Sequence, residues 1–144
     1  MTDVPLYRLY LLRAMYLIIA AGMGVQIWPL LFHHRPWEVM HGVGVSFLAA
    51  LTLICLAGVR YPLAMLPLLV FEFLWKAIWM LAIALPAVLH HHFDADVRET
   101  AFACGLGVVL VPLVLPWPYL FARFVRAPGD RWGRVRGIVQ AAAA

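Results

Sequence analysis

Four long apolar runs, separated by short polar segments, make up most of the chain. They cover residues 6–32, 39–59, 61–89 and 101–125. A helix needs about 20 predominantly apolar residues to cross the hydrocarbon core of a bilayer, and each run is long enough. Because backbone polar groups in lipid must be satisfied within the protein, the runs favour helices over open sheets. The pattern predicts an all-α integral membrane four-helix bundle with short loops, forming one domain over residues 1–126.

Composition agrees with this pattern. The chain has 144 residues, of which 65% are apolar and 12% are charged, whereas soluble domains have about 25% charged residues. Four crossings leave no room for a separate soluble domain. The first run follows a short basic N-terminus as in a signal peptide, but it continues to Phe32, too far for such a segment, so we interpret it as an uncleaved first span.

Charge is distributed unevenly between the two ends of this predicted bundle. If the chain crosses four times, eight arginines fall on one side and two, Arg35 and Arg98, fall on the other; the eight are Arg8, Arg13, Arg60, Arg123, Arg126, Arg131, Arg134 and Arg136. This asymmetry follows the positive-inside rule. It predicts a multi-pass protein of a bacterial-type inner membrane with both termini in the cytoplasm. It also argues against nucleic acid as the reason for the net charge of +4.

The basic C-terminal segment, residues 127–144, is predicted to be a cytoplasmic tail. Together with the end of the fourth run it forms the Arg-rich sequence RFVRAPGDRWGRVR. Arginines next to a membrane attract anionic lipid headgroups by about 1 kcal/mol each. We therefore expect the lipid bilayer as a partner, with anionic headgroups at this tail.

Prolines, aspartates and cysteines predict local features of the spans. Pro67 and Pro86 can each kink the third span, because proline lacks a backbone donor. The Pro116–Trp117–Pro118 sequence predicts a bend or an end in the fourth run. Asp94 or Asp96 is a candidate N-cap at the start of the fourth helix. Cys55 and Cys104 are expected at opposite membrane depths and therefore unpaired.

The third run contains an acid and a base near its middle, Glu72 and Lys76. Residues four apart share a helix face, and acid before base is the favourable order. Because each central charge costs roughly 2.5–3.5 kcal/mol in a membrane helix, we expect the pair to face the bundle interior. Trp75 and Trp79 are expected nearby, with a cation–π contact to the ammonium. The structural alternative is a pair that is neutralised internally and fixes helix register, or that joins two protomers.

Two further polar residues, Gln26 and His41, lie in the outer halves of the first and second spans. With Glu72, Lys76, Trp75 and Trp79, they are the predicted lining of one cavity that binds a ligand or a proton and opens to the outside. Gln26 as an interhelical hydrogen-bond partner and His41 as an interfacial residue are the alternatives. The small residues Gly42 and Ser46 predict a helix-packing face, and hence a homo-oligomer.

All six histidines fall on the outer side, and they form a second candidate site. Imidazole and carboxylate groups suit divalent transition metals. If the two loops meet in space, the ligands would come from His33, His34, His90, His91, His92 and Asp94. The histidines occur in runs without the spacing of a known ligand motif, so polar interfacial loops are the alternative.

These features favour a binding or transport function over catalysis. Nucleophile-elbow, phosphate-loop and dinucleotide-binding motifs are absent from the sequence, so it does not favour an enzyme. The first hypothesis is a small membrane protein that binds or moves a proton or a small polar or amphipathic ligand at a buried polar pocket. The alternatives are an accessory or assembly subunit of a membrane complex, and an outer-face metal-binding protein.

Overall fold

The computed structural model describes residues 4–33, 38–91 and 94–129, and every regular element in these ranges is a helix. Four helical segments are long and apolar enough to cross a membrane: Leu6–Phe32, Val39–Arg60, Leu66–Leu89 and Ala95–Val114. The predicted all-helical fold with four candidate spans is confirmed at this level. Residues 130–144, which hold most of the Arg-rich tail, lie outside the described residues.

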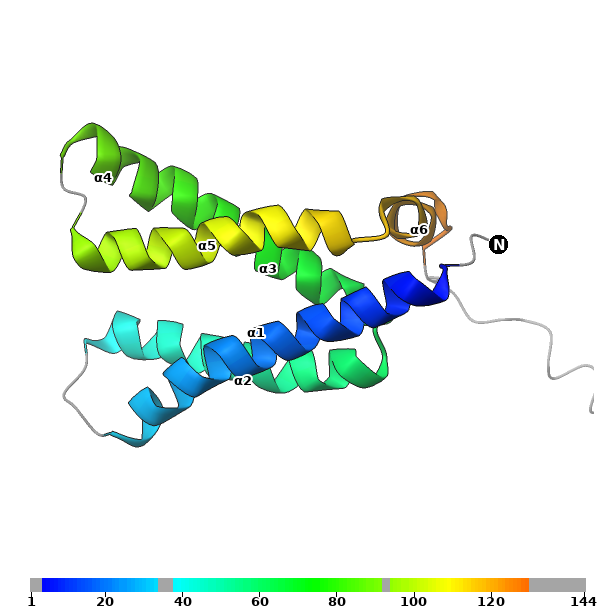
Figure 1. Cartoon of the computed structure of the whole chain (residues 1–144), viewed down its shortest axis with the longest axis horizontal. Coiled ribbons are helices and arrows are strands. Elements are labelled where there is room, and N and C mark those ends of the chain that lie inside the picture. The colour runs from blue at the N-terminus through cyan, green and yellow to red at the C-terminus, as the bar shows by residue number, and fades with distance from the viewer. Residues whose placement is uncertain (1–3, 34–37, 92–93, 130–144) are drawn as a thin grey trace, which may run out of the picture.

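The spans form two antiparallel hairpins (Figure 1). The first consists of α1 (Leu6–Phe32) and α2 (Val39–Arg60). The second pairs α5 (Ala95–Val114) with a third span in three parts: α3 (Leu66–Trp79), the π-helix η1 (Met80–Ala84) and α4 (Leu85–Leu89). The hairpins diverge toward the end where α1 meets α2 in sequence, and converge toward the N-terminus.

The core lies at the converging end and takes residues from all four spans. The buried members of this cluster are Leu12, Met15, Tyr16 and Ile19 of α1, Leu51 and Cys55 of α2, Leu66 and Leu69 of α3, Val111 of α5 and Leu115 at its end. A smaller cluster of Ile27, Val45 and Ala49 joins α1 to α2 farther along the first hairpin. Many large apolar side chains elsewhere on these four helical segments are exposed.

The prolines of the third span act at helix starts. Residues 61–65 form turns, and α3 begins at Leu66 with Pro67 in its first turn, where a missing N–H costs nothing. Pro86 is the second residue of α4, which follows the π-helix η1 directly. Because proline cannot donate to the carbonyl four residues before it, a wider helical turn is one way to accommodate it.

The fourth helix is shifted in sequence from its expected position. The apolar pattern predicted residues 101–125, whereas α5 spans Ala95–Val114. Its first turn is polar and was therefore missed; Asp94 occupies the N-cap position, without a side-chain cap hydrogen bond. At the other end the helix stops before Pro116, which confirms the predicted end. Two short elements follow, α6 (Trp117–Phe121) and the π-helix η2 (Ala122–Arg126).

Candidate functional site

The buried face of α3 carries the acid–base pair into the bundle. Its buried residues are Leu66, Leu69, Glu72 and Lys76, a spacing of three and four that keeps them on one side of the helix. Leu66 and Leu69 belong to the core shared by all four spans, and Glu72 and Lys76 continue the same face beyond it. Glu72 is 0% exposed and Lys76 9%, so the expected inward orientation of the pair is confirmed.

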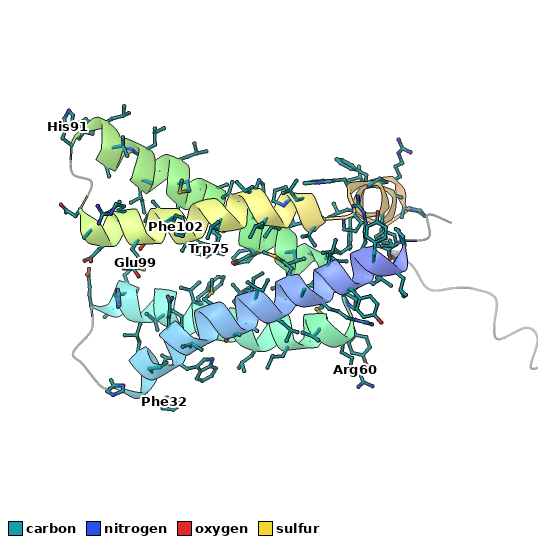
Figure 2. The ribbon with its side chains drawn as sticks, in the orientation of Figure 1. Phe32, Arg60, Trp75, His91, Glu99 and Phe102 are labelled. Carbon is teal, nitrogen blue, oxygen red and sulfur yellow. The ribbon has the colours of Figure 1, made fainter. Side chains whose placement is uncertain are left out.

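The two charged groups are in direct contact, and Trp75 joins them. Lys76 Nζ lies 2.6 Å from Glu72 Oε1. The Trp75 indole N–H donates to Glu72 Oε2 at 2.5 Å, and Lys76 Nζ lies 5.5 Å from the centre of the Trp75 ring. The expected cation–π contact is therefore present at Trp75, which lies near the middle of the bundle (Figure 2). Trp75 holds both partners, one through its N–H and one through its ring.

Glu72 Oε1 differs from Oε2 in its surroundings. Oε1 is buried and accepts no hydrogen bond of good geometry among the described residues. Its contact with Lys76 Nζ at 2.6 Å is an ion pair. A buried carboxylate oxygen loses the hydrogen bonds that it makes in water. The ammonium of Lys76 is therefore the main partner of Oε1 among the described residues.

The opposite wall of the centre is built from α5 and α2. A Cβ atom on Gly107 of α5 would lie 2.6 Å from Lys76 Cδ and 2.7 Å from Nζ, so the lysine packs directly on the Gly107 backbone. Cys104 of α5 and Cys55 of α2 are buried, and Phe47 of α2 contacts Phe71 of α3 with ring centres 5.3 Å apart. The centre thus lies where the two hairpins meet.

Cys104 lies in the middle of α5, because this helix begins at Ala95 and not at the start of the apolar run. Both cysteines are free, as expected.

The other predicted ligand-binding residues lie outside this closed centre. Trp79 is half-buried at the end of α3, one turn beyond Trp75. Gln26 on α1 and His41 on α2 are exposed. The structure does not bring Gln26 and His41 into an enclosed cavity with Glu72 and Lys76, and their role in binding stays a prediction.

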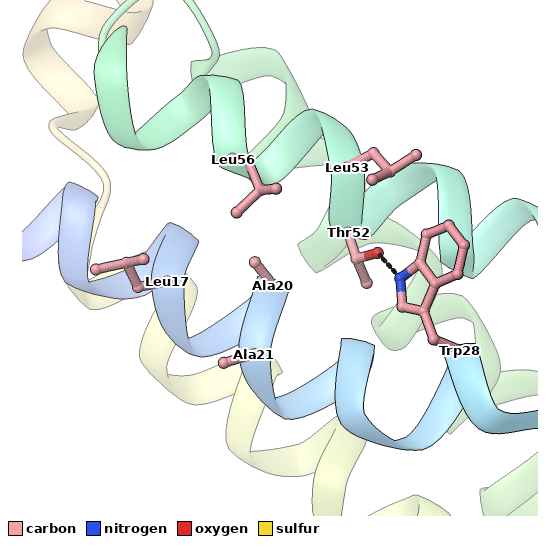
Figure 3. A pocket seen from close by; sticks show the side chains of 7 residues that line it. All are labelled: Leu17, Ala20, Ala21, Trp28, Thr52, Leu53 and Leu56. Atoms are coloured by element: carbon pink, nitrogen blue, oxygen red, sulfur yellow. Dashed lines mark hydrogen bonds between the residues drawn. The ribbon is translucent and has the colours of Figure 1, made fainter.

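A groove of about 190 Å³ lies elsewhere, between α1 and α2 (Figure 3). Its lining is apolar except at one end, and consists of Leu17, Ala20, Ala21, Trp28, Thr52, Leu53 and Leu56. At that end the Trp28 indole N–H donates to Thr52 Oγ1 at 3.0 Å, and the Thr52 hydroxyl donates to the Ala49 carbonyl at 2.7 Å. Trp28 of α1 therefore links the two helices of the first hairpin through this hydrogen bond to α2.

The described histidines do not assemble a metal site. His33 follows α1, and its Nδ1–H donates to the Pro29 carbonyl at 2.7 Å. His90 and His91 are exposed at the end of the other hairpin, and His91 lies far from the end of α1 in Figure 2. Within the described ranges no group of three or more His, Cys, Asp or Glu side chains could hold a metal ion. His34 and His92 fall outside those ranges; Asp94 is exposed at the start of α5.

Three functional or structural residues were missed by sequence reasoning. Lys76 packs against Gly107, and the ring of Tyr16 packs against Gly58. Thr52 accepts a hydrogen bond from Trp28. Glycine and threonine are common in membrane helices. Their presence alone therefore does not show which of them a particular distant side chain contacts. The weak signal that was available is the occurrence of Gly105 and Gly107 close together in the fourth predicted span.

Fold and site together define an all-helical protein with four candidate membrane spans and a buried acid–base pair where two hairpins meet. Comparisons of the chain with protein-family models, with curated proteins and with solved structures find no match.

Proposed function

We propose that this chain is a multi-pass protein of a bacterial-type inner membrane, with both termini cytoplasmic, that binds or moves a proton or a small polar or amphipathic ligand. Glu72 and Lys76 are the binding groups, and Trp75 positions them. Four candidate spans and the excess of arginines at one end support the location and orientation. In this proposal the structure represents the closed state of the centre.

The observation that carries the proposal is the surroundings of the Glu72 carboxylate. It is fully buried, and its Oε1 is paired with Lys76 Nζ at 2.6 Å. Ionisable residues within membrane spans are costly, and they are usually found on pathways for ions, protons or substrates. A proton or a ligand N–H or O–H group would compete with Lys76 Nζ for Oε1.

Charge balance suggests how binding would be coupled to motion. As an ion pair, Glu72 and Lys76 attract each other strongly, because the surroundings are poorly polarisable. Protonation of Glu72, or its contact with a cationic ligand group, removes that attraction and leaves the ammonium without its counter-ion. Lys76 would then favour water, and the centre would open where the hairpins meet. A ligand would enter from the end where the two hairpins diverge (Figure 1). It would pass Gln26 and His41 on its way to Glu72 and Lys76.

The experiment is infrared difference spectroscopy of the full chain in liposomes during a pH titration. A protonated buried carboxyl group gives a carbonyl band, which we expect in the parent and not in Glu72→Gln. The matched control is Glu99→Gln, since Glu99 is exposed on α5 and should leave the band unchanged. Proton flux into dye-loaded liposomes would be measured in the same samples. A parent without a titrating buried carboxyl group and with the flux of empty liposomes would contradict the proposal.

The geometry gives less support to the alternatives. An accessory subunit would contact its partner through Glu72 and Lys76, but both are enclosed within this chain. A metal-binding protein was expected to join its two histidine loops, and the described histidines lie apart. A homo-oligomer through the Gly42 and Ser46 face stays a prediction; Ser46 is exposed on α2.

A further inference from the structure

The segment after the fourth span turns across the end of the bundle. Leu115 is extended, and Pro116 begins α6. In Figure 1 the long helices are seen from the side, whereas α6 is seen along its axis. Trp117–Arg126, helical throughout as α6 and η2, therefore runs across the direction of the spans. We name this segment the crossing helix.

Two side chains donate hydrogen bonds to carbonyl groups just before Pro116. Pro116 has no N–H, so the Pro112 carbonyl lacks its usual partner four residues later. The Trp117 indole N–H donates to it at 2.8 Å. Arg8 Nη1 donates to the Leu115 carbonyl at 3.3 Å from the start of α1. The direction of the crossing helix is thus fixed at both carbonyls and does not depend on a loose linker.

The crossing helix has one exposed apolar side and two exposed arginines. Trp117 and Phe121 are 39% and 51% exposed, and their rings are 6.3 Å apart. Phe124 and Val125 extend this apolar side one turn further, at 51% and 66% exposed. Tyr119 and Leu120 pack against the core, and Arg123 and Arg126 are exposed. Exposed aromatic residues beside arginines are typical of helices that lie in a membrane interface.

The charge of this end of the molecule completes the pattern. Its described part contains five arginines and no carboxylate; the arginines are Arg8, Arg13, Arg60, Arg123 and Arg126. The described part of the opposite end contains Arg98 with four carboxylates: Glu38, Asp94, Asp96 and Glu99. The crossing helix therefore lies at the end that attracts anions.

We propose that the crossing helix lies in the headgroup layer of the bilayer and binds anionic lipid headgroups through Arg123 and Arg126, with Trp117, Phe121, Phe124 and Val125 inserted among the upper acyl chains. The inference rests on the proposed membrane insertion of the spans, but not on any ligand of Glu72. It assigns a lipid site to a segment that the apolar pattern had placed within the fourth span.

The first test measures depth with nitroxide labels on the full chain in vesicles of phosphatidylcholine and phosphatidylglycerol. Labels are attached at Phe121→Cys and, as a reference, at Leu106→Cys, which is exposed on α5. We expect the Leu106 label to be deep, and the Phe121 label to be shallow, about 5–10 Å into the boundary between headgroups and acyl chains. The unlabelled cysteines Cys55 and Cys104 are buried, and the parent protein gives the background.

The outcomes separate this inference from the proposed membrane insertion. A deep Leu106 label with a Phe121 label in water would overturn the inference and leave the spans in place. The inference also fails if the Phe121 label is at the bilayer centre, or is shielded from both oxygen and water by a second protein. Both labels in water would overturn the inference and the membrane insertion together.

The second test counts retained phosphatidylglycerol by native mass spectrometry. Replacing two headgroup-binding arginines should weaken the affinity by about 30-fold, so Arg123→Gln/Arg126→Gln should lose bound phosphatidylglycerol. The control is Arg98→Gln at the opposite end, which should retain it. Equal retention by all three proteins, or equal loss in both variants, would overturn the lipid site.

Discussion

At the residue scale, the fold depends on a carboxylate and an ammonium that are enclosed together. Each charged group alone is costly in a membrane helix. The pair is tolerated because the attraction between the two charges offsets part of the cost of removing them from water. Trp75 adds a donor to Glu72 Oε2 and a ring face to Lys76. Replacing only one of the two residues should therefore lower the stability of the protein more than replacing both.

We predict that Glu72→Gln and Lys76→Met each lower the free energy of unfolding by about 3–5 kcal/mol, because each leaves an uncompensated buried polar or charged group. The double variant should lose clearly less than the sum of the two. Unfolding in mixed detergent micelles, followed by helical circular dichroism, measures all three. The control is Glu38→Gln, an exposed carboxylate; additive losses in the double variant would show that the two groups are not coupled.

Gly107 offers a second test of the same centre. We predict that Gly107→Ala lowers the free energy of unfolding by about 1–3 kcal/mol, because its Cβ would lie 2.6 Å from Lys76 Cδ and would push Nζ away from Glu72. Gly105→Ala on the same helix is the matched control. It has no atom within 4 Å of a new Cβ, and should be neutral or stabilising.

The loss at Gly107 should also depend on the length of the lysine. In a Lys76→Ala background the added methyl group meets no long side chain, so Gly107→Ala should then cost much less. The same unfolding measurement gives the coupling energy. An equal cost in both backgrounds would mean that Gly107 contributes through its own helix and not through Lys76.

The sequence predicts the Glu72–Lys76 pair, but it does not predict that Lys76 packs against Gly107. Glu72 and Lys76 are recognisable because charges are rare in apolar runs and a spacing of four places them together. Gly107 is separated from Lys76 by a loop and half a helix, and its importance depends on the register of α5 against α3. That register follows from where α5 starts, and the polar first turn hid the start from an apolar pattern.

At the scale of elements, the first hairpin is joined to the third span through Tyr16. Its hydroxyl donates to the Pro62 carbonyl at 3.1 Å, in the turn that leads from α2 to α3. Its ring lies against Gly58 of α2, where a Cβ would be 2.6 Å from Cε1 and 2.7 Å from Cγ. One buried side chain of α1 thus sets the distance to α2 and the direction in which the second hairpin begins.

We predict that Gly58→Ala destabilises the protein by about 1–3 kcal/mol, because a rigid ring within a packed core cannot move aside as an exposed side chain would. Gly44→Ala, on the same helix with no atom within 4 Å of its new Cβ, is the control and should cost nothing. Detergent unfolding followed by circular dichroism gives both values. A Gly58→Ala variant as stable as the control would show that Tyr16 can repack.

The hydrogen bond of Tyr16 can be tested separately from its ring. We predict that Tyr16→Phe costs about 1–3 kcal/mol, because it leaves the Pro62 carbonyl without this donor in a buried place. The α1–α2 packing keeps its shape in this variant, so the loss should not depend on residue 58. Unfolding of Tyr16→Phe and of the Tyr16→Phe/Gly58→Ala double variant measures this; a strongly non-additive result would contradict the separation.

The prolines show how far element boundaries can be derived from sequence. Pro116 was expected to bend or end the fourth span, and the helix ends there because the missing N–H frees a carbonyl that Trp117 then binds. Pro67 was expected to kink the third span, but the turns at residues 61–65 place it in a first turn instead. Local chemistry thus predicts that proline changes the helix, and tertiary context decides whether the change is a start, a wider turn or an end.

At the scale of the whole molecule, the described chain has an arginine end and an acidic end joined by four apolar spans. The arginine end is also where the hairpins converge on their shared core, and where the crossing helix lies. Hydropathy predicted the number of spans because burial in lipid demands length and apolarity. The pairing of the spans into two hairpins that part toward the acidic end depends on side-chain packing between distant segments, which no single run of sequence contains.

Orientation in the membrane can be tested with two engineered cysteines of matched size. Ala64 is exposed in the turn between α2 and α3, and Ala95 is exposed at the start of α5. With the arginine end in the cytoplasm, we predict that a membrane-impermeant maleimide labels Ala95→Cys in intact cells, and Ala64→Cys after the membrane is opened. Background labelling should be low because Cys55 and Cys104 are buried. The reverse pattern would invert the topology and place the crossing helix in the outer leaflet, while labelling of both sites in intact cells would mean that the spans do not separate two compartments.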